Sequence, residues 1–169
     1  MDNIEMMVQE LVLELKLFTL LVIVNGAPIL ARNVFPSWNA AIDQGRKAWD
    51  KRPWLGKSKT WRGLLAGISA GILTAFLLGF PWLHGLLLSA VSLSGDILTS
   101  FIKRRLDLKP SSQAPILDQF LEVSLPLGAA QYLYPLPTLN AIGVLVAFVV
   151  FNWGISPLLY RMGLRKKPY

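Results

Sequence analysis

Charged side chains are absent from two long segments of this chain. The first runs from Gly63 to Gly95, over 33 residues, and the second from Val123 to Tyr160, over 38 residues. A helix crosses a bilayer in about 20 apolar residues, so each segment is too long for one span. GFPWLHG around Pro81 divides the first and YPLP at Tyr134–Pro137 divides the second, and such stretches are typical of turns. The two segments therefore predict two pairs of membrane-spanning helices.

Another apolar stretch, Leu11–Ala31, precedes both segments and carries Glu14 and Lys16 near its start, where long side chains reach the interface. The whole pattern predicts an all-α integral membrane protein that forms a single transmembrane domain over residues 1–169. Its five transmembrane helices are expected at about 11–31, 63–80, 82–102, 117–134 and 138–160. The two long loops between them, 32–62 and 103–116, are expected on the same side of the membrane.

The basic residues predict an orientation. Of the 17 Lys and Arg residues, all but Lys16 lie in 32–62, 103–109 and 161–167. Cytoplasmic loops of membrane proteins are enriched in Lys and Arg. We therefore expect a multi-pass protein of the cell membrane with its N-terminus outside, its C-terminus inside, and both long loops in the cytoplasm. Any active site built from these loops would face the cytoplasm.

Composition narrows the class of protein further. Hydrophobic residues make up 53% of the 169-residue chain and charged residues 16%, with a mean hydropathy of +0.47, which is too apolar for an ordinary soluble domain. The absence of cysteine and the single histidine, His84, exclude disulfides, thiolate metal sites and imidazole clusters. Orientation, together with anionic lipid or phosphate, accounts for the net charge of +7, so we expect no nucleic-acid partner.

The third predicted span has a polar face. On a helix of 3.6 residues per turn, five polar side chains fall within an arc of about 100°: Ser92, Asp96, Thr99, Ser100 and Lys103. A carboxylate inside the membrane is costly, so it should face the interior and have a partner. One interpretation is an ion pair of Asp96 with Lys103 or an arginine that only joins helices. Another is the carrier site of a small ion or proton transporter.

A second acid, Asp118, and the surrounding bases favour a third interpretation. Two carboxylates among cations suit a complex of magnesium with a triphosphate, because carboxylates hold the metal while Lys and Arg neutralise phosphate oxygens. LGKSKTWRG at Leu55–Gly63 adds lysines and hydroxyls at the start of a predicted helix, where the dipole favours an anion. It lacks the spacing of a P-loop, and a solvated positive loop is the alternative interpretation of this segment.

The two loops together resemble the phosphatidate cytidylyltransferase superfamily. SKTWRG at 58–63 is similar to the family motif S-P-x-K-T-x-E-G. SFIKRR at Ser100–Arg105, followed by ILDQF at Ile116–Phe120, is similar to its signature S-x-x-K-R followed by L-D-R. KTWRG, AIDQG, LDQ and the short chain resemble more closely the archaeal branch, the CDP-archaeol synthases. The resemblance covers the chain from Asn25 onward.

This resemblance implies a CTP-dependent nucleotidyltransferase that moves a cytidylyl group to an isoprenoid glycerol-ether phosphate lipid and releases pyrophosphate. An ester lipid, as in CDP-diacylglycerol synthase, is the alternative substrate. Asp96 and Asp118 are implied as ligands of Mg²⁺, with Lys103 as a further catalytic residue. The implied nucleotide and phosphate contacts are Lys59, Thr60, Arg62, Ser100, Arg104 and Gln119, and the implied lipid-phosphate or loop contacts are Asn25, Pro28 and Asp43. A second divalent or a monovalent cation, and an oligomer, are left open.

The chain departs from the family pattern in both loops. Lys57 and Ser58 stand where the archaeal branch usually has Asp and Gly. Leu121 stands where the wider family has a further aspartate, and Glu122 follows one residue later, so the role of Glu122 is left open. The four-residue spacing of three glycines in the second predicted span (Gly63, Gly67, Gly71) indicates close helix packing, either within the chain or in a dimer.

Overall fold

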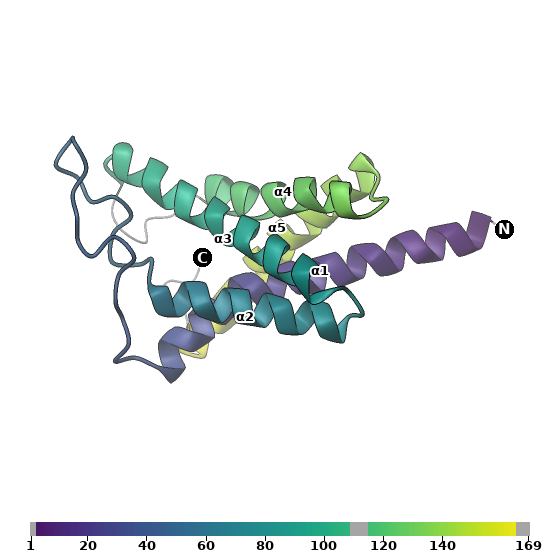
Figure 1. Ribbon diagram of the computed structural model, residues 1–169, viewed down its shortest axis with the longest axis horizontal. Helices are drawn as coiled ribbons and strands as arrows, with labels where there is room; N and C mark the ends of the chain where they lie inside the picture. The colour runs from purple at the N-terminus through teal and green to yellow at the C-terminus, as the bar shows by residue number, and fades with distance from the viewer. Residues whose placement is uncertain (1–2, 109–114, 165–169) are drawn as a thin grey trace.

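Five helices make up most of the chain, and loop 35–60 is the longest connection that the structure describes (Figure 1). The structure is a computed structural model. It describes residues 3–108 and 115–164, except for the side chains of 115–118. The helices are α1 (Asn3–Val34), α2 (Trp61–Leu77), α3 (Trp82–Arg105), α4 (Pro115–Leu133) and α5 (Thr138–Arg161). In these described ranges the only β pairing is two isolated bridges in the loop, which confirms the predicted all-helical class.

Helices α3 and α5 are each 24 residues long and apolar enough to cross a membrane, and α2 is a shorter apolar helix of 17 residues. Helix α2 begins where Thr60 caps it, because the Thr60 Oγ1 accepts a hydrogen bond of 3.2 Å from the Gly63 amide. It ends at a turn in which Gly79 has a φ of +78°, a conformation that suits glycine. Pro81 then precedes the first turn of α3.

Helix α1 is longer than the apolar stretch that indicates it. It begins at Asn3 and includes Glu5 and Glu10, and its N-terminal part extends beyond the other helices (Figure 1). Ile4 there is 72% exposed. Hydropathy marks where a helix enters apolar surroundings, whereas helix formation also follows the propensity of residues such as Glu, Met, Leu and Gln. The helix therefore also includes the charged residues that precede the apolar stretch.

The glycine-spaced face of α2 packs against α1 and α3, as the sequence predicts. A Cβ added to Gly67 would lie 3.2 Å from the backbone oxygen of Val24, and one added to Gly71 would lie 2.6 Å from the Ser89 Cβ. These distances leave no room for a larger residue, so both glycines permit close contact of helices within this chain. Around this contact lies an apolar core with members from each helix, including Leu20, Ala75, Leu88, Val123 and Phe148.

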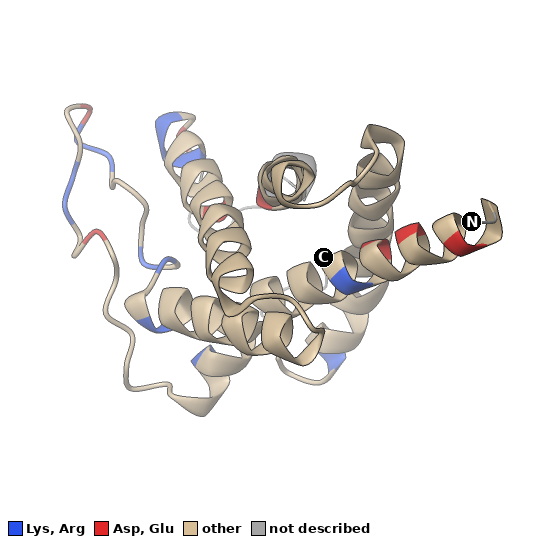
Figure 2. Ribbon diagram, turned by 45° about the vertical axis from the view of Figure 1, so that its right-hand side comes forward, with Lys and Arg blue, Asp and Glu red and all other residues tan. Residues whose placement is uncertain are grey.

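The cationic side chains gather at one end of the bundle. Figure 2 shows most of the Lys and Arg residues on loop 35–60 and on the helix ends beside it. The last turn of α3 contributes Lys103, Arg104 and Arg105, and α1 contributes Arg32. The N-terminal part of α1, at the opposite end, carries acidic residues (Figure 2). The helices therefore direct most of the positive charge toward the same end as the loop.

Candidate active site

Asp43 organises loop 35–60. Its Oδ2 accepts hydrogen bonds from the amides of Leu55 (2.9 Å) and Gly56 (2.8 Å), and its Oδ1 accepts one from the Gly45 amide (3.1 Å). Burial raises the pKa of the Asp43 carboxyl, but these amide hydrogen bonds outweigh it, and the pKa lies below its ordinary value of 3.8. The charge of Asp43 therefore holds two parts of the loop together.

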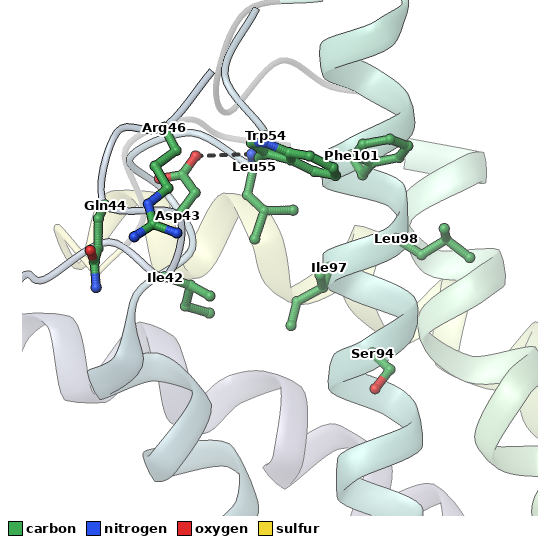
Figure 3. A pocket seen from close by; sticks show the side chains of 10 residues that line it. All are labelled: Ile42, Asp43, Gln44, Arg46, Trp54, Leu55, Ser94, Ile97, Leu98 and Phe101. Atoms are coloured by element: carbon green, nitrogen blue, oxygen red, sulfur yellow. Dashed lines mark hydrogen bonds between the residues drawn. The ribbon is translucent and has the colours of Figure 1, made fainter. Parts of the chain in front are cut away.

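A hollow of about 610 Å³ lies beside Asp43, between the loop and α3 (Figure 3). Ile42, Trp54, Ile97 and Phe101 form much of its wall. This hollow, rather than the central cavity described below, is the one that Asp43 lines. The sequence predicts Asp43 as a lipid-phosphate or loop contact, and its hydrogen bonds favour the second of these roles.

Arg105 at the end of α3 fastens the loop to the helices. Its NH1 lies 2.6 Å from the Asp50 Oδ1, and its NH2 donates a hydrogen bond of 2.6 Å to the Pro53 carbonyl. The guanidinium also lies over the rings of Trp49 and Phe101, a favourable arrangement for a cation. These contacts fix the loop segment that precedes Lys59.

A central cavity of about 800 Å³ lies among the helices and the end of the loop. Of the predicted site residues whose side chains the structure describes, all except Asp43 line it: Asn25, Pro28, Lys59, Thr60, Arg62, Asp96, Ser100, Lys103, Arg104 and Gln119. Asp118 belongs to the first turn of α4, but its side chain is outside the described residues. Segments far apart in the sequence therefore supply one cavity, as the paired motifs predict.

Asp96 forms an ion pair with Lys59 inside this cavity. The two side chains are 25% and 18% exposed, and Lys103 interacts electrostatically with the same carboxylate. Lys59 belongs to the loop motif, and Asp96 lies on α3 about one turn before the motif at Ser100–Arg105. The ion pair therefore connects the loop motif with the helix that carries the second motif. The sequence suggested Lys103 or an arginine as the partner of Asp96; in the structure Lys59 forms an ion pair with Asp96, and Lys103 also acts on this carboxylate.

Glu122 is the residue that the sequence analysis left without a role. Its side chain forms a hydrogen bond with the Asp96 carboxyl, and it lines the same cavity. The Glu122 carbonyl accepts a hydrogen bond of 2.8 Å from the Ser92 Oγ, which also accepts one of 3.1 Å from the Asn25 Nδ2. This network connects α1, α3 and α4. Glu122 follows Asp118 by about one turn of α4, and this helical spacing is the sequence signal that could have identified Glu122.

The Nε of Arg62 and the Oε1 of Gln119 are buried polar atoms of the cavity that have no hydrogen-bond partner within the described part of the chain. A buried polar atom without a partner costs about 1–3 kcal/mol. The Arg62 NH1 donates to the Phe35 carbonyl, which fixes the guanidinium while its Nε stays available. One donor and one acceptor are thus positioned for a polar ligand.

The carboxylate pair fits a hard divalent cation. Asp96 and Glu122 offer oxygen ligands in one cavity, and Mg²⁺ is commonly held by one or two carboxylates together with substrate phosphates. Within residues 3–108 and 115–164, excluding the undescribed side chains, no group of three or more Asp, Glu or His residues could hold a metal. A metal here would therefore need oxygen atoms from the substrate, or from Asp118, to complete its coordination.

Three further polar residues line the cavity and were not identified from the sequence: Arg32 on α1, and Asn152 and Ser156 on α5. Asn152 and Ser156 lie four residues apart on the most apolar helix, and Ser156 is buried. Two polar side chains at this spacing share a helix face, and in an apolar helix this pattern was a usable signal.

Comparison with known proteins finds relatives of this chain. The family described as CarS-like, CDP-archaeol synthase, matches residues 10–169. A CDP-archaeol synthase of Thermococcus gammatolerans is 34% identical over 160 residues, covering 86% of this chain and 88% of the relative. One of Hyperthermus butylicus is 38% identical over 133 residues, covering 73% and 77% respectively. A solved structure, described as structural insight into an intramembrane enzyme for archaeal membrane lipids biosynthesis, aligns with a TM-score of 0.69 and 29% identity, covering 82% of this chain and 89% of its own.

Proposed function

The chain belongs to the CarS-like family of CDP-archaeol synthases, and on this premise we propose that it transfers the cytidylyl group of CTP to an isoprenoid glycerol-ether phosphate. Membership of this family makes it a CTP-dependent cytidylyltransferase, a nucleotidyltransferase of archaeal lipid synthesis. The family sets the transporter interpretation of Asp96 aside. The proposal concerns the lipid substrate, the metal and the residues that carry the reaction.

In the reaction, an oxygen of the lipid phosphate attacks the α-phosphorus of CTP. The bond between that phosphorus and the oxygen bridging to the β-phosphate breaks, and pyrophosphate leaves. The products are a CDP-activated lipid and pyrophosphate. The lipid phosphate is already an anion, so no side chain has to remove a proton from it, and catalysis depends on positioning and charge neutralisation.

Cations around the cavity would bind the triphosphate. Lys59, Lys103 and Arg104 can neutralise phosphate oxygens and the charge that develops on pyrophosphate. The Arg62 Nε adds a donor, and Thr60 lies at the N-terminus of α2, where the helix dipole favours an anion. Ser100 is a further hydroxyl at this wall. The Gln119 Oε1 is an acceptor for a donor group of the nucleotide.

Asp96 and Asp118 would hold Mg²⁺, with Glu122 as an additional oxygen donor beside Asp96. When bound, the metal would supply positive charge that neutralises phosphate oxygens and withdraws electrons from the reacting phosphorus. In the free protein, the Lys59 ammonium forms an ion pair with the Asp96 carboxylate. We infer that Lys59 moves from this carboxylate to a phosphate oxygen when CTP and the metal bind.

The proposed placement in the membrane follows from charge. The five helices would each span the bilayer as a single domain, with the N-terminus outside and the cavity facing the cytoplasm, where CTP is available. The gathering of Lys and Arg at the loop end (Figure 2) supports this orientation. The lipid phosphate would then lie at the inner headgroup plane, at the level of the loop.

One observation carries the proposal: the ion pair of Asp96 and Lys59, which connects the loop motif with the helix of the second motif in a cavity lined with further cations. The test measures pyrophosphate release by purified protein supplied with CTP, Mg²⁺ and the ether lipid phosphate. Asp96→Asn should lower kcat on the order of 100-fold. Asp107→Asn is the matched control, because the Asp107 side chain is 78% exposed and pairs, at 3.6 Å, with Arg52, which does not line the cavity.

The result that overturns the proposal is wild-type protein that releases no pyrophosphate with the ether lipid while it stays folded. Full activity of Asp96→Asn would overturn the assignment of the metal ligand. A parallel assay with an ester lipid phosphate decides the substrate class, because a clear preference for the ester lipid would contradict the proposed ether substrate.

A further inference from the structure

Helix α1 contacts α5 at one end of a stretch and the segment that follows α5 at the other, and the two helices line the central cavity between these contacts. At one end, the rings of Phe18 and Phe151 meet edge to face with their centroids 5.5 Å apart. At the other end, the Arg32 NH2 donates a hydrogen bond of 2.6 Å to the Leu164 carbonyl. Phe18 and Arg32 are 14 residues apart, which corresponds to about 21 Å along a helix.

The facing walls of this stretch are mainly apolar. On α1, Val22, Asn25 and Ile29 recur at three or four residues between Phe18 and Arg32, so they share the helix face that makes both contacts. On α5, Ile155 and Leu159 follow Phe151 at four-residue steps. All of these residues line the central cavity. We call the stretch between the two contacts the α1–α5 window.

The window opens to the surface of the bundle. Four side chains that line the cavity are also exposed: Ile23 (39%) and Leu30 (54%) on α1, and Phe151 (36%) and Trp153 (55%) on α5. All four are apolar, and their exposed surface suits hydrocarbon rather than water. Gly26 lies between Ile23 and Leu30, and a Cβ added there would meet no atom within 4 Å.

We propose that the α1–α5 window is the entrance and binding site for the hydrocarbon chains of the lipid phosphate, an inference that rests on the proposed function. The chains lie between Val22 and Ile29 on one wall and Ile155 and Leu159 on the other. Arg32, at the basic end of the window, is complementary to the phosphate. The window is about 21 Å long. The hydrocarbon of one leaflet is about 15 Å deep, half of a core of about 30 Å, so the window is long enough to hold a lipid chain through the whole depth of one leaflet.

This placement explains why the central cavity has both charged and apolar walls. The phosphate is delivered beside Lys59 and Asp96 while the chains stay in the bilayer, so the lipid need not leave the membrane. Removal of long apolar chains from the bilayer would cost about 0.8 kcal/mol for each methylene. A side opening avoids that cost.

The test is to obstruct the window. Gly26→Phe places a ring at its edge, where an added Cβ meets no atom within 4 Å, and Ile29→Trp enlarges a residue on the face toward α5. Gly154→Phe is the matched control, because a Cβ at Gly154 also meets nothing within 4 Å, yet this exposed residue does not line the cavity. Thermal unfolding in detergent checks that all three variants fold.

Gly26→Phe and Ile29→Trp should raise the KM for the long-chain lipid phosphate about tenfold or more, equivalent to about 1.4 kcal/mol of lost binding. The KM for CTP should be unchanged, and an analogue with short ether chains should be used almost as well as by the wild type. Gly154→Phe should match the wild type with every substrate. An active wild type together with a folded Gly26→Phe variant of unchanged long-chain KM would overturn the inference and leave the proposed function intact, whereas an inactive wild type would overturn the proposed function.

Discussion

Charged side chains at half-buried positions reduce the stability of this protein through desolvation, and the partners of these side chains indicate their function. Asp96 lies among Lys59, Lys103 and Glu122, so two acids and two bases share one small volume. An ion pair of limited exposure contributes little net stability, because desolvation offsets much of the attraction. We therefore interpret the group as a site that exchanges partners when substrate binds, rather than as a device that joins helices.

The first prediction concerns Glu122. Glu122→Gln keeps the size and the hydrogen-bonding capacity of the side chain but removes its charge, and we expect it to weaken divalent-metal binding roughly tenfold. Mn²⁺ titrated into the protein with CTP and followed by electron paramagnetic resonance measures this affinity directly. Glu14→Gln is the control, since Glu14 lies on α1 and does not line the cavity. Equal Mn²⁺ affinity in wild type and Glu122→Gln would refute the role.

The second prediction concerns Asp43 and pH. Its folded-state pKa is lowered below 3.8 by the amides of Gly56, Leu55 and Gly45, so its contribution is present at neutral pH and is lost as pH falls through the folded-state value. Asp43→Asn should cost about 1–3 kcal/mol at pH 7, because its NH₂ group would face backbone donors. The difference from wild type should shrink below pH 3.8.

Thermal unfolding in detergent across that pH range measures the difference between wild type and Asp43→Asn. Asp107→Asn, which changes an exposed carboxyl of the same charge, should unfold like the wild type throughout. A difference between wild type and Asp43→Asn that stays constant down to pH 2 would show that the charge of Asp43 does not stabilise the loop.

At the scale of the helices, glycines set the distances that the site needs. Gly95, next to Asp96, lies against α4: an added Cβ would be 2.5 Å from the Leu121 carbonyl oxygen. That oxygen belongs to the backbone, so it cannot turn aside as a side chain can. Because Glu122 is the next residue of α4, the close approach at Gly95 also sets the contact between Glu122 and Asp96.

The third prediction follows from this contact. Gly95→Ala should destabilise the protein by about 1–3 kcal/mol and lower kcat, because α4 must move away from α3. Gly128→Ala on α4 meets nothing within 4 Å and should stabilise the helix by about 0.5–1 kcal/mol. Thermal unfolding and pyrophosphate release together measure both effects. A Gly95→Ala variant as stable and as active as Gly128→Ala would contradict the proposed role of this contact.

The sequence predicted the helices better than their mutual register. Uncharged runs and proline-containing turns located the apolar helices, because the cost of burying charge acts locally along the chain. The role of Glu122 was left open because it depends on how α4 is rotated relative to Asp96, and that rotation depends on Gly95 and Leu121 together. Asp43 was recognised only as a loop residue, since its hydrogen bonds reach residues twelve and thirteen positions away.

At the scale of the whole molecule, the charges form a gradient from one end of the bundle to the other. The bases gather around loop 35–60 and the acids of α1 lie at the far end (Figure 2). Such a distribution favours one orientation in a membrane, and in the proposed orientation the cavity faces the side that holds CTP. Orientation and chemistry therefore depend on the same basic residues, and a reversed protein would present its site to the wrong compartment.

The fourth prediction tests that orientation. The chain has no cysteine, so single cysteines give unambiguous labelling. In sealed vesicles with the outer face exposed, a membrane-impermeant maleimide should label Thr138→Cys, at the start of α5, but not Lys57→Cys, in loop 35–60, until detergent opens the vesicles. Both positions are exposed in the structure, so protection by the membrane, rather than burial in the protein, explains a lack of labelling. The opposite pattern would place the cavity outside the cell, where the enzyme would have no supply of CTP, and the proposed topology would have to be reversed.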